Sequence, residues 1–154
     1  MKRLLIIILC FWAIGARSQG KVSTLKVYGE DGKSVIGKVL VNAGTSTKLL
    51  LLKSIQKKDT SGNYSTTFYL GNKETTPLLD ARILMKFNKA VIAVKPDFST
   101  AFNSINGLAD DHMTYSFKAG RLDRDPGSVV IISFTIKSKE KVVTEISGLD
   151  GIAQ

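Results

Sequence analysis

The sequence predicts an all-β domain, built as an antiparallel sandwich of two sheets with about eight or nine strands. Apolar residues recur with a period of two along most of the 154-residue chain, as in the segment 63–70. Turn-forming residues interrupt this alternation about every 8 to 12 residues. No segment shows the longer period of an extended amphipathic helix. These three observations together favour a sandwich over a helical or mixed fold.

The first segment, residues 1–18, has the pattern of a secretory signal peptide. Basic residues precede an apolar run over residues 4–14. At about 1.5 Å per residue, this run is about half as long as a membrane-spanning helix needs to be. Ala16 and Ser18 carry small side chains where a signal peptidase requires them, so we expect cleavage before Gln19.

Cleavage would leave a single domain over residues 19–154, soluble and either secreted or periplasmic. The only Cys and the only Trp of the chain lie in the segment that is removed. The mature domain therefore has no disulfide, cysteine nucleophile, Cys-ligated zinc or iron–sulfur cluster. Its stability must come from an apolar core, which a chain of this size can supply. An exported domain without cysteine favours a bacterial envelope.

Turns separate the expected strands of the first half. An Asp31-Gly32 turn, typical of tight hairpins, joins the first two. The third contains Leu49 to Leu52, a run that is apolar on both faces and indicates a central strand. A second turn at Ser61-Gly62-Asn63 leads into the fourth. The expected strands span residues 22–28, 35–43, 48–56, 63–70, 81–87, 90–96, 112–118, 128–137 and 141–147.

The strands of the second half supply much of the expected core. A tight connection at residues 87–90 follows the fifth strand. In the seventh, Met113, Tyr115 and Phe117 alternate as the buried face, so His112 points outward. The expected core consists of Val39, Val41, Leu51, Phe68, Ile83, Met85, Tyr115, Phe117, Ile132 and Phe134.

Three segments in the C-terminal half follow one another in an order that can be compared with known folds. They are Gly107-Leu108, Tyr115 to Gly120 and Val129 to Ile136. The series resembles the later strands of bacterial immunoglobulin-like or fibronectin type III-like modules. The resemblance implies an immunoglobulin-like sandwich with Tyr115 as its corner tyrosine. A second likeness, over residues 83–136, is to cohesin-type sandwiches. The spacing departs from the fibronectin pattern and its core tryptophan is absent, and neither likeness transfers a binding residue.

The longest stretch expected to be irregular, residues 97–111, is the candidate binding loop. Long loops in compact domains often carry recognition. Its aromatic rings could form an apolar platform beside carboxylate and amide groups. In the alternative interpretation, the stretch crosses between the sheets and its phenylalanines join the core. The candidate residues are Asp97, Phe98, Phe102, Asn103, Asn106, Asp110 and Asp111.

A weaker candidate is a basic patch at the tip of the last expected hairpin, made of Lys137, Lys139 and Lys141. The whole chain carries a formal net charge of +9, and such a patch could hold an anionic polymer. Nucleic acid is not expected, because no aromatic residues interleave with the lysines. Lysines at turns and edges also prevent sheets from pairing edge to edge, and this alternative stays open.

Neither catalysis nor metal binding is expected. His112 is the only histidine, and no motif supplies the acid and oxyanion hole of a triad. The aspartates Asp110, Asp111, Asp123 and Asp125 lack the spacing of a calcium loop. The sequence around Asp125-Pro126-Gly127 is a turn in its own right. We therefore assign no catalytic residue, no metal and no cofactor.

The sequence thus favours a non-catalytic binding or structural module of a bacterial envelope. Such a module would recognise an envelope protein or a polysaccharide through its loops. Two alternatives stay open. One is a small-ligand carrier with an enclosed β-cavity. The other is a hydrolase with paired carboxylates, whose separation cannot be read from the sequence.

Overall fold

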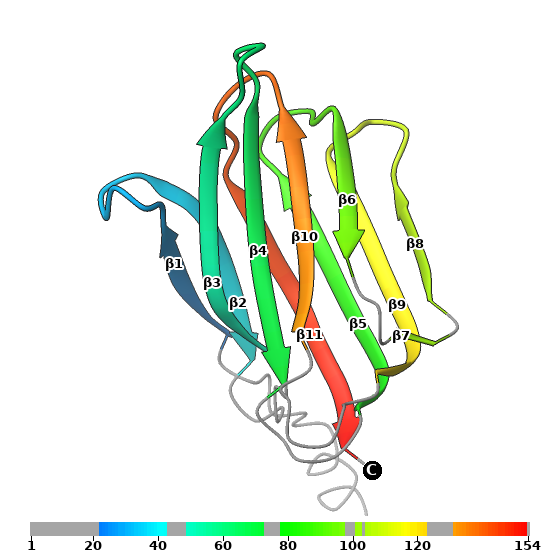
Figure 1. The fold of residues 1–154 in the computed structure, drawn as a ribbon. Helices are drawn as coiled ribbons and strands as arrows, with labels where there is room; N and C mark the ends of the chain where they lie inside the picture. The colour runs from blue at the N-terminus through cyan, green and yellow to red at the C-terminus, as the bar shows by residue number, and fades with distance from the viewer. Residues whose placement is uncertain are drawn as a thin grey trace, which may run out of the picture.

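The computed structural model describes residues 22–42, 49–72, 78–97, 101–102, 104–122 and 131–153. Within these residues the chain forms two facing sheets and no helix (Figure 1). Accordingly, no helix suited to crossing a membrane occurs in this part of the chain. The predicted all-β sandwich of two sheets is confirmed.

The larger sheet has seven strands in the order β1-β2-β11-β5-β9-β7, and β8 also pairs with β9. All its pairings are antiparallel except that of β2 with β11, which is parallel. The strands are β1 (Val22–Tyr28), β2 (Val35–Asn42), β5 (Leu78–Phe87), β7 (Ala101–Phe102), β8 (Ile105–Leu108), β9 (Thr114–Leu122) and β11 (Thr144–Ala153).

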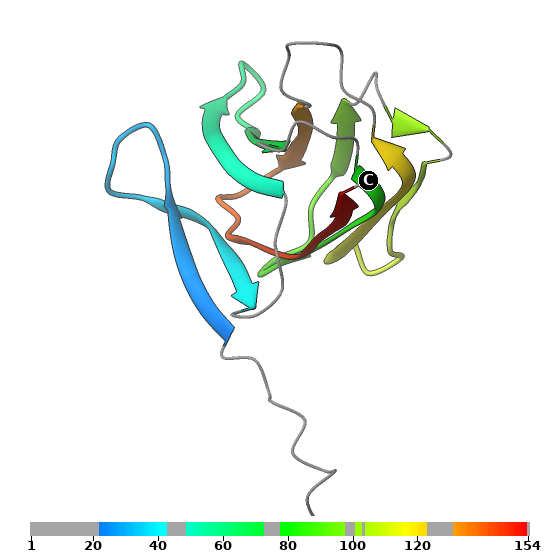
Figure 2. The ribbon, with the colours of Figure 1, turned by 90° about the horizontal axis from the view of Figure 1, so that it is seen from below.

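The smaller sheet has four antiparallel strands in the order β3-β4-β10-β6. Figure 2 shows the two sheets facing one another, with the hairpin of β1 and β2 reaching out to one side. The strands of this sheet are β3 (Leu49–Lys58), β4 (Tyr64–Asn72), β6 (Ala93–Asp97) and β10 (Ile131–Ser138).

The structure contains all nine expected strands and adds two, β7 and β8. Both additions lie in the stretch 97–111, which was expected to be irregular. β8 pairs with β9 from Ile105 opposite Lys118 to Leu108 opposite Tyr115. A strand this short holds only two repeats of the alternation, so periodicity alone does not reveal it.

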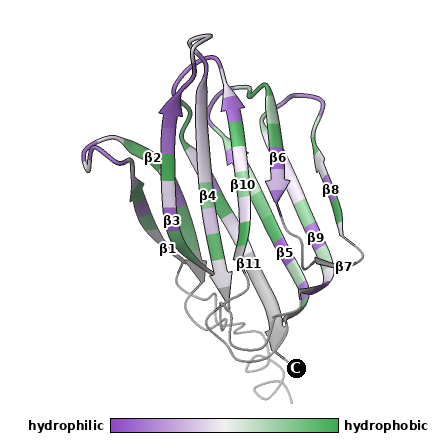
Figure 3. Cartoon of the chain, viewed as in Figure 1, coloured by the Kyte–Doolittle hydropathy of each residue, from purple (hydrophilic) through white to green (hydrophobic). Residues whose placement is uncertain are grey.

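The core lies between the sheets, where rings from both meet. Phe134 of β10 makes edge-to-face contacts with Tyr115 and Phe117 of β9, at centroid distances of 5.8 and 5.5 Å. Figure 3 shows polar and apolar residues alternating along β10, as a strand with one buried face requires. Of the predicted core residues, the buried ones are Val39, Phe68, Ile83, Met85, Tyr115, Phe117, Ile132 and Phe134.

The two other predicted core residues differ from this group. Leu51 is only partly buried and packs against the core. The side chain of Val41 lies outside the described residues. The core also contains Ile36, although a strict period of two along β2 would place it on the face opposite Val39.

The prediction that Leu49 to Leu52 forms a central strand is wrong, because β3 is an edge strand. The apolar run instead contains a bulge: the pairing with β4 shifts between Leu51 and Lys53. The side chain of Leu52 is 43% exposed. It also lies over Gly71, where its Cδ1 would clash with any Cβ. Glycine at position 71 thus leaves the space that the Leu52 side chain occupies.

The predicted burial of Met113 is also wrong, since its side chain is 39% exposed. The alternation of β9 begins only at Thr114, and His112, the residue before Met113, has a φ of 55°. That left-handed conformation belongs to a turn and breaks the period of two. His112 itself is exposed, as expected.

Tyr115 is a core residue and not a corner tyrosine. Its hydroxyl is buried and has no hydrogen-bond partner among the described residues, whereas a corner tyrosine bonds to the backbone. Burial raises its pKa to about 12. The implication drawn from the immunoglobulin-like resemblance therefore fails at this residue.

The hairpin turn between β1 and β2 forms as predicted. Gly32 has a φ of 64°, which glycine adopts without strain. The Asp31 carboxylate accepts hydrogen bonds from the Ser34 hydroxyl and from the backbone N–H groups of Ser34 and Lys33. Because these bonds favour the charged form, they lower the pKa of Asp31 to about 2.

Candidate functional site

The structure distributes the candidate binding loop over edge strands of both sheets, from β6 of the smaller sheet to β7 and β8 of the larger one. Asp97 is exposed at the end of β6, and Asn106 lies on β8 opposite Phe117. Asp110 and Asp111 lie in the turn before β9, away from Asp97 (Figure 1). Phe98, Asn103 and the side chain of Phe102 lie outside the described residues. The described candidates therefore do not converge on one point.

The turn that carries Asp111 does meet the basic patch. A shallow hollow of about 460 Å³ has Asp111, His112 and Lys139 among its lining residues. The nearby charges are already engaged: Lys89 pairs with Glu140, and the Asp111 carboxylate accepts from the Met113 N–H at 2.8 Å.

The imidazole of His112 is engaged as well. Its Nδ1 lies 2.9 Å from the Val91 carbonyl oxygen. A second hydrogen bond joins the same two residues through the backbone, because the Val91 N–H donates to the carbonyl of His112. This end of the sandwich is thus a set of turns that hold one another in place.

A different site is formed on the outer face of the four-stranded sheet. Phe68 and Phe134 are paired opposite one another in the core, so the residues flanking each of them point outward. Four of these flanking residues carry hydroxyl groups and form a two-by-two block, which we call the hydroxyl block. It consists of Thr67, Tyr69, Ser133 and Thr135.

Strand register fixes the geometry of the hydroxyl block. Tyr69 is paired with Ser133, and Thr67 with Thr135. The two threonine hydroxyls lie 3.0 Å apart and share a hydrogen bond. All four side chains are half-buried. With Lys95, Pro96 and Asp97 they line a hollow of about 350 Å³.

Charged side chains surround the hydroxyl block. Lys53 pairs across β3 and β4 with Tyr69, and Lys95 pairs across β6 and β10 with Thr135. Asp97, opposite Ser133, places one carboxylate at the same rim. We call these residues, with two lysines further along the strands, the charged rim. It consists of Lys53, Lys57, Lys95, Asp97 and Lys137.

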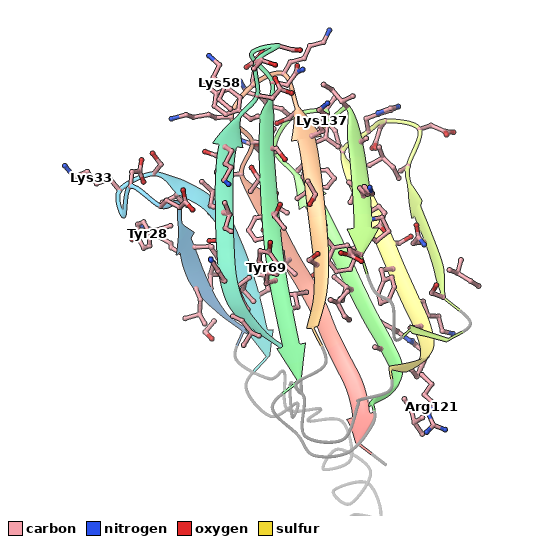
Figure 4. All side chains as sticks on the ribbon, in the orientation of Figure 1. Tyr28, Lys33, Lys58, Tyr69, Arg121 and Lys137 are labelled. Carbon is pink, nitrogen blue, oxygen red and sulfur yellow. The ribbon has the colours of Figure 1, made fainter. Side chains whose placement is uncertain are left out.

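The charged rim carries an excess of positive charge. All its members are exposed. Lys137 lies 3.7 Å from the Asp59 carboxylate in the turn between β3 and β4. The Asn63 backbone N–H donates to Asp59, and this bond lowers the pKa of that carboxyl. Figure 4 shows Lys137 near the same turn as Lys58. Even with Asp59 counted, lysines outnumber carboxylates around the face.

Two of the sequence candidates, Asp97 and Lys137, therefore belong to this face, although they came from different candidate groups. The hydroxyl block was missed. The alternation around Phe68 places Thr67 and Tyr69 outward, so their exposure could have been inferred. The sequence does not reveal the pairing of β4 with β10 or of β10 with β6, because these pairings join distant parts of the chain.

The described residues contain no group of three or more His, Cys, Asp or Glu side chains placed to hold a metal ion. Asp123 and Asp125, which were considered for calcium, lie outside these residues.

No protein-family model and no curated protein matches the sequence. Among solved structures, the chain is similar to the yeast delta-COP-I mu-homology domain, at 11% sequence identity and a TM-score of 0.36. The match covers 71% of this chain and 57% of that domain. A likeness of this degree transfers neither a family nor a function to this chain.

Proposed function

We propose that this protein is a non-catalytic binding module of a bacterial envelope. It recognises a polysaccharide through the outer face of its four-stranded sheet. The observation that carries the proposal is the hydroxyl block, in which Thr67, Tyr69, Ser133 and Thr135 lie together on adjacent strands. The proposal keeps the function class expected from the sequence and moves recognition from the loops to a sheet face.

The chemistry of the hydroxyl block suits a sugar chain. Each hydroxyl can both donate and accept a hydrogen bond, as can the hydroxyls of a sugar. The ring of Tyr69 adds an apolar surface with a polar tip. Because the block lies on paired strands, its groups are held in place before the ligand arrives, which lowers the entropic cost of binding.

The carboxylates at this face argue for binding without hydrolysis. Among the residues that line the hollow, Asp97 is the only carboxylate. Glycoside hydrolysis generally uses two carboxyl groups about 5 to 10 Å apart. His112 belongs to the turns at the end of the sandwich and does not line this hollow.

The packing of the core favours a surface site over an enclosed ligand cavity. Phe68, Phe134 and Ile132 from the smaller sheet and Tyr115 and Phe117 from the larger one are all buried. Ring contacts at 5.5 and 5.8 Å link the two sheets. Side chains thus occupy the space in which a carrier would hold its ligand.

The proposed location rests on residues 1–18, which have the pattern of a signal peptide. These residues lie outside the part of the chain that the structure describes. A polysaccharide-binding role agrees with this location, because envelope polysaccharides lie outside the cytoplasm.

The test compares two tyrosines. Tyr69→Ala removes the ring at the hydroxyl block, and Tyr28→Ala removes an exposed ring on the β1–β2 hairpin. Figure 4 shows the two residues on different strands, Tyr28 on β1 and Tyr69 on β4, and Tyr28 is 48% exposed. Binding to purified envelope polysaccharides is measured by affinity electrophoresis and calorimetry. We expect Tyr69→Ala to weaken binding at least about tenfold, and Tyr28→Ala to leave it within about twofold.

Circular dichroism and urea unfolding confirm that both variants are folded. If a folded Tyr69→Ala variant binds as tightly as the unaltered protein, the outer face is not the site. If the unaltered protein binds no polysaccharide, the proposed function itself fails.

A further inference from the structure

We infer that the polysaccharide bound at this face is acidic, and that Lys53 and Lys95 bind its anionic groups. This inference rests on the proposed function and names its ligand class. The feature that carries it is the position of these two lysines, each directly beside one row of the hydroxyl block.

Strand pairing sets the arrangement. In one row, Lys53 of β3 is followed across the sheet by Tyr69 and Ser133. In the next row, Thr67 and Thr135 are followed by Lys95 of β6. Neighbouring strands lie about 4.8 Å apart, so each ammonium group can reach a ligand held by the adjacent hydroxyls. The two positive charges thus stand at diagonally opposite corners of the block.

Both lysines are available to a ligand. Lys53 and Lys95 are exposed, and neither forms an ion pair within the described residues. Other lysines differ: Lys89 pairs with Glu140, and Lys118 lies 3.5 Å from Asp80. An anion at Lys53 or Lys95 would therefore displace no carboxylate of the described residues.

Asp97 makes the charge pattern asymmetric. It occupies the corner beyond Ser133, in the same row as Lys53. An anionic group placed there would be repelled, whereas one beside Lys53 or Lys95 would be attracted. The face therefore favours an acidic sugar chain whose carboxylates lie beside Lys53 and Lys95 and whose hydroxyls lie beside Asp97.

Nucleic acid fits this face less well than an acidic polysaccharide. Single-stranded nucleic acids are bound by a series of aromatic rings that stack on successive bases. The hydroxyl block offers one ring, Tyr69, and three aliphatic hydroxyls. These groups match the hydroxyls of sugar units better than the faces of bases.

Lysines on edge strands can also serve to prevent sheets from pairing, and both β3 and β6 are edge strands. The experiment must therefore separate ligand binding from edge protection and from overall charge. The test variant is Lys53→Gln/Lys95→Gln. The matched control is Lys26→Gln/Lys38→Gln, which removes the same charge from an exposed pair on β1 and β2.

Three probes are used with the full chain: polygalacturonate, neutral dextran and duplex DNA. We expect the unaltered protein to prefer polygalacturonate, with an affinity that falls as salt increases. Loss of two charge-assisted contacts should weaken this binding at least about tenfold. The control pair should change it by less than about twofold. Tyr69→Ala should also weaken it, because the ring and the lysines serve one ligand.

Each other outcome overturns the inference in a distinguishable way. If dextran binds as tightly as polygalacturonate and depends on Tyr69, the proposed function stands and the acidic specificity is wrong. If DNA binds as tightly through the same lysines, the face is a general polyanion surface. If both lysine pairs weaken binding equally, only overall charge matters. If no polysaccharide binds, the proposed function fails together with the inference.

Discussion

Replacing Phe134 with alanine tests the packing that holds the two sheets together. Phe134 is fully buried on β10, and its ring lies edge-on between those of Tyr115 and Phe117. The two interplanar angles, 68° and 74°, are those of favourable T-shaped pairs.

The expected magnitude follows from burial and ring contacts. A phenylalanine side chain buries about 150 Å² or more, which at about 25 cal/mol/Å² is worth about 4 kcal/mol. Each T-shaped contact adds about 0.5 to 1.5 kcal/mol. Alanine retains Cβ, and the core relaxes in part. We therefore expect Phe134→Ala to lower the free energy of unfolding by about 4 to 5 kcal/mol, at the upper end for such substitutions.

The measurement is equilibrium unfolding in urea, followed by fluorescence and circular dichroism. Because a domain of this size has about 5 to 15 kcal/mol of stability, Phe134→Ala can leave little folded protein. Phe134→Leu, expected to cost about 1.5 kcal/mol or less, keeps the test informative. Thr135→Ala, the outward neighbour, controls for changes in the strand itself. A loss below about 1 kcal/mol for Phe134→Ala would place this ring outside the core.

Three further predictions concern Tyr115 and the N-terminal segment. Tyr115→Phe removes a buried hydroxyl without a partner, so we expect stability to rise by about 1 kcal/mol in urea unfolding; a clear loss would mean that the hydroxyl is bonded. Burial raises the pKa of Tyr115 from 10.0 to about 12. The folded state thus favours the neutral form of Tyr115. The free energy of unfolding should therefore be constant below about pH 10 and fall as the pH rises through 12. In the Tyr115→Phe variant this fall should be smaller. The exported protein should begin at Gln19, as measured by intact mass, and an uncleaved N-terminus or an acyl chain on Cys10 would contradict the signal-peptide interpretation.

Local periodicity was sufficient to predict most of the fold. A strand of seven or more residues with one buried face repeats its pattern often enough to be recognised, as β10 does around Phe134. The failures occur where local geometry departs from regular pleating. At Leu52 a bulge makes a one-sided edge strand look apolar on both faces. At His112 a positive φ interrupts the alternation, so that Met113 is exposed.

The candidate site was harder to predict, because it depends on which strands are neighbours. Thr67 and Thr135 lie far apart in the sequence, and only the pairing of β4 with β10 brings their hydroxyls to 3.0 Å. Polar outward residues of single strands are common and carry no signal of their own. The stretch 97–111, by contrast, was chosen as a candidate because it shows no periodic pattern. Part of it is nevertheless a regular strand, β8, which pairs with β9 at the edge of the larger sheet.

The parallel pairing of β2 with β11 has a consequence for how this chain folds. Gly37 pairs with Thr144 and Val39 with Ile146, and β11 also pairs with β5 on its other side. The β1–β2 hairpin can form from local contacts, but it has no place in the larger sheet until β11 is available. Pairings between such distant segments slow folding, because a long loop must close first. For a chain exported as we propose, we therefore expect the larger sheet to remain incomplete until β11 has been synthesised, and a chain that has not completed its sheet can still cross a membrane unfolded.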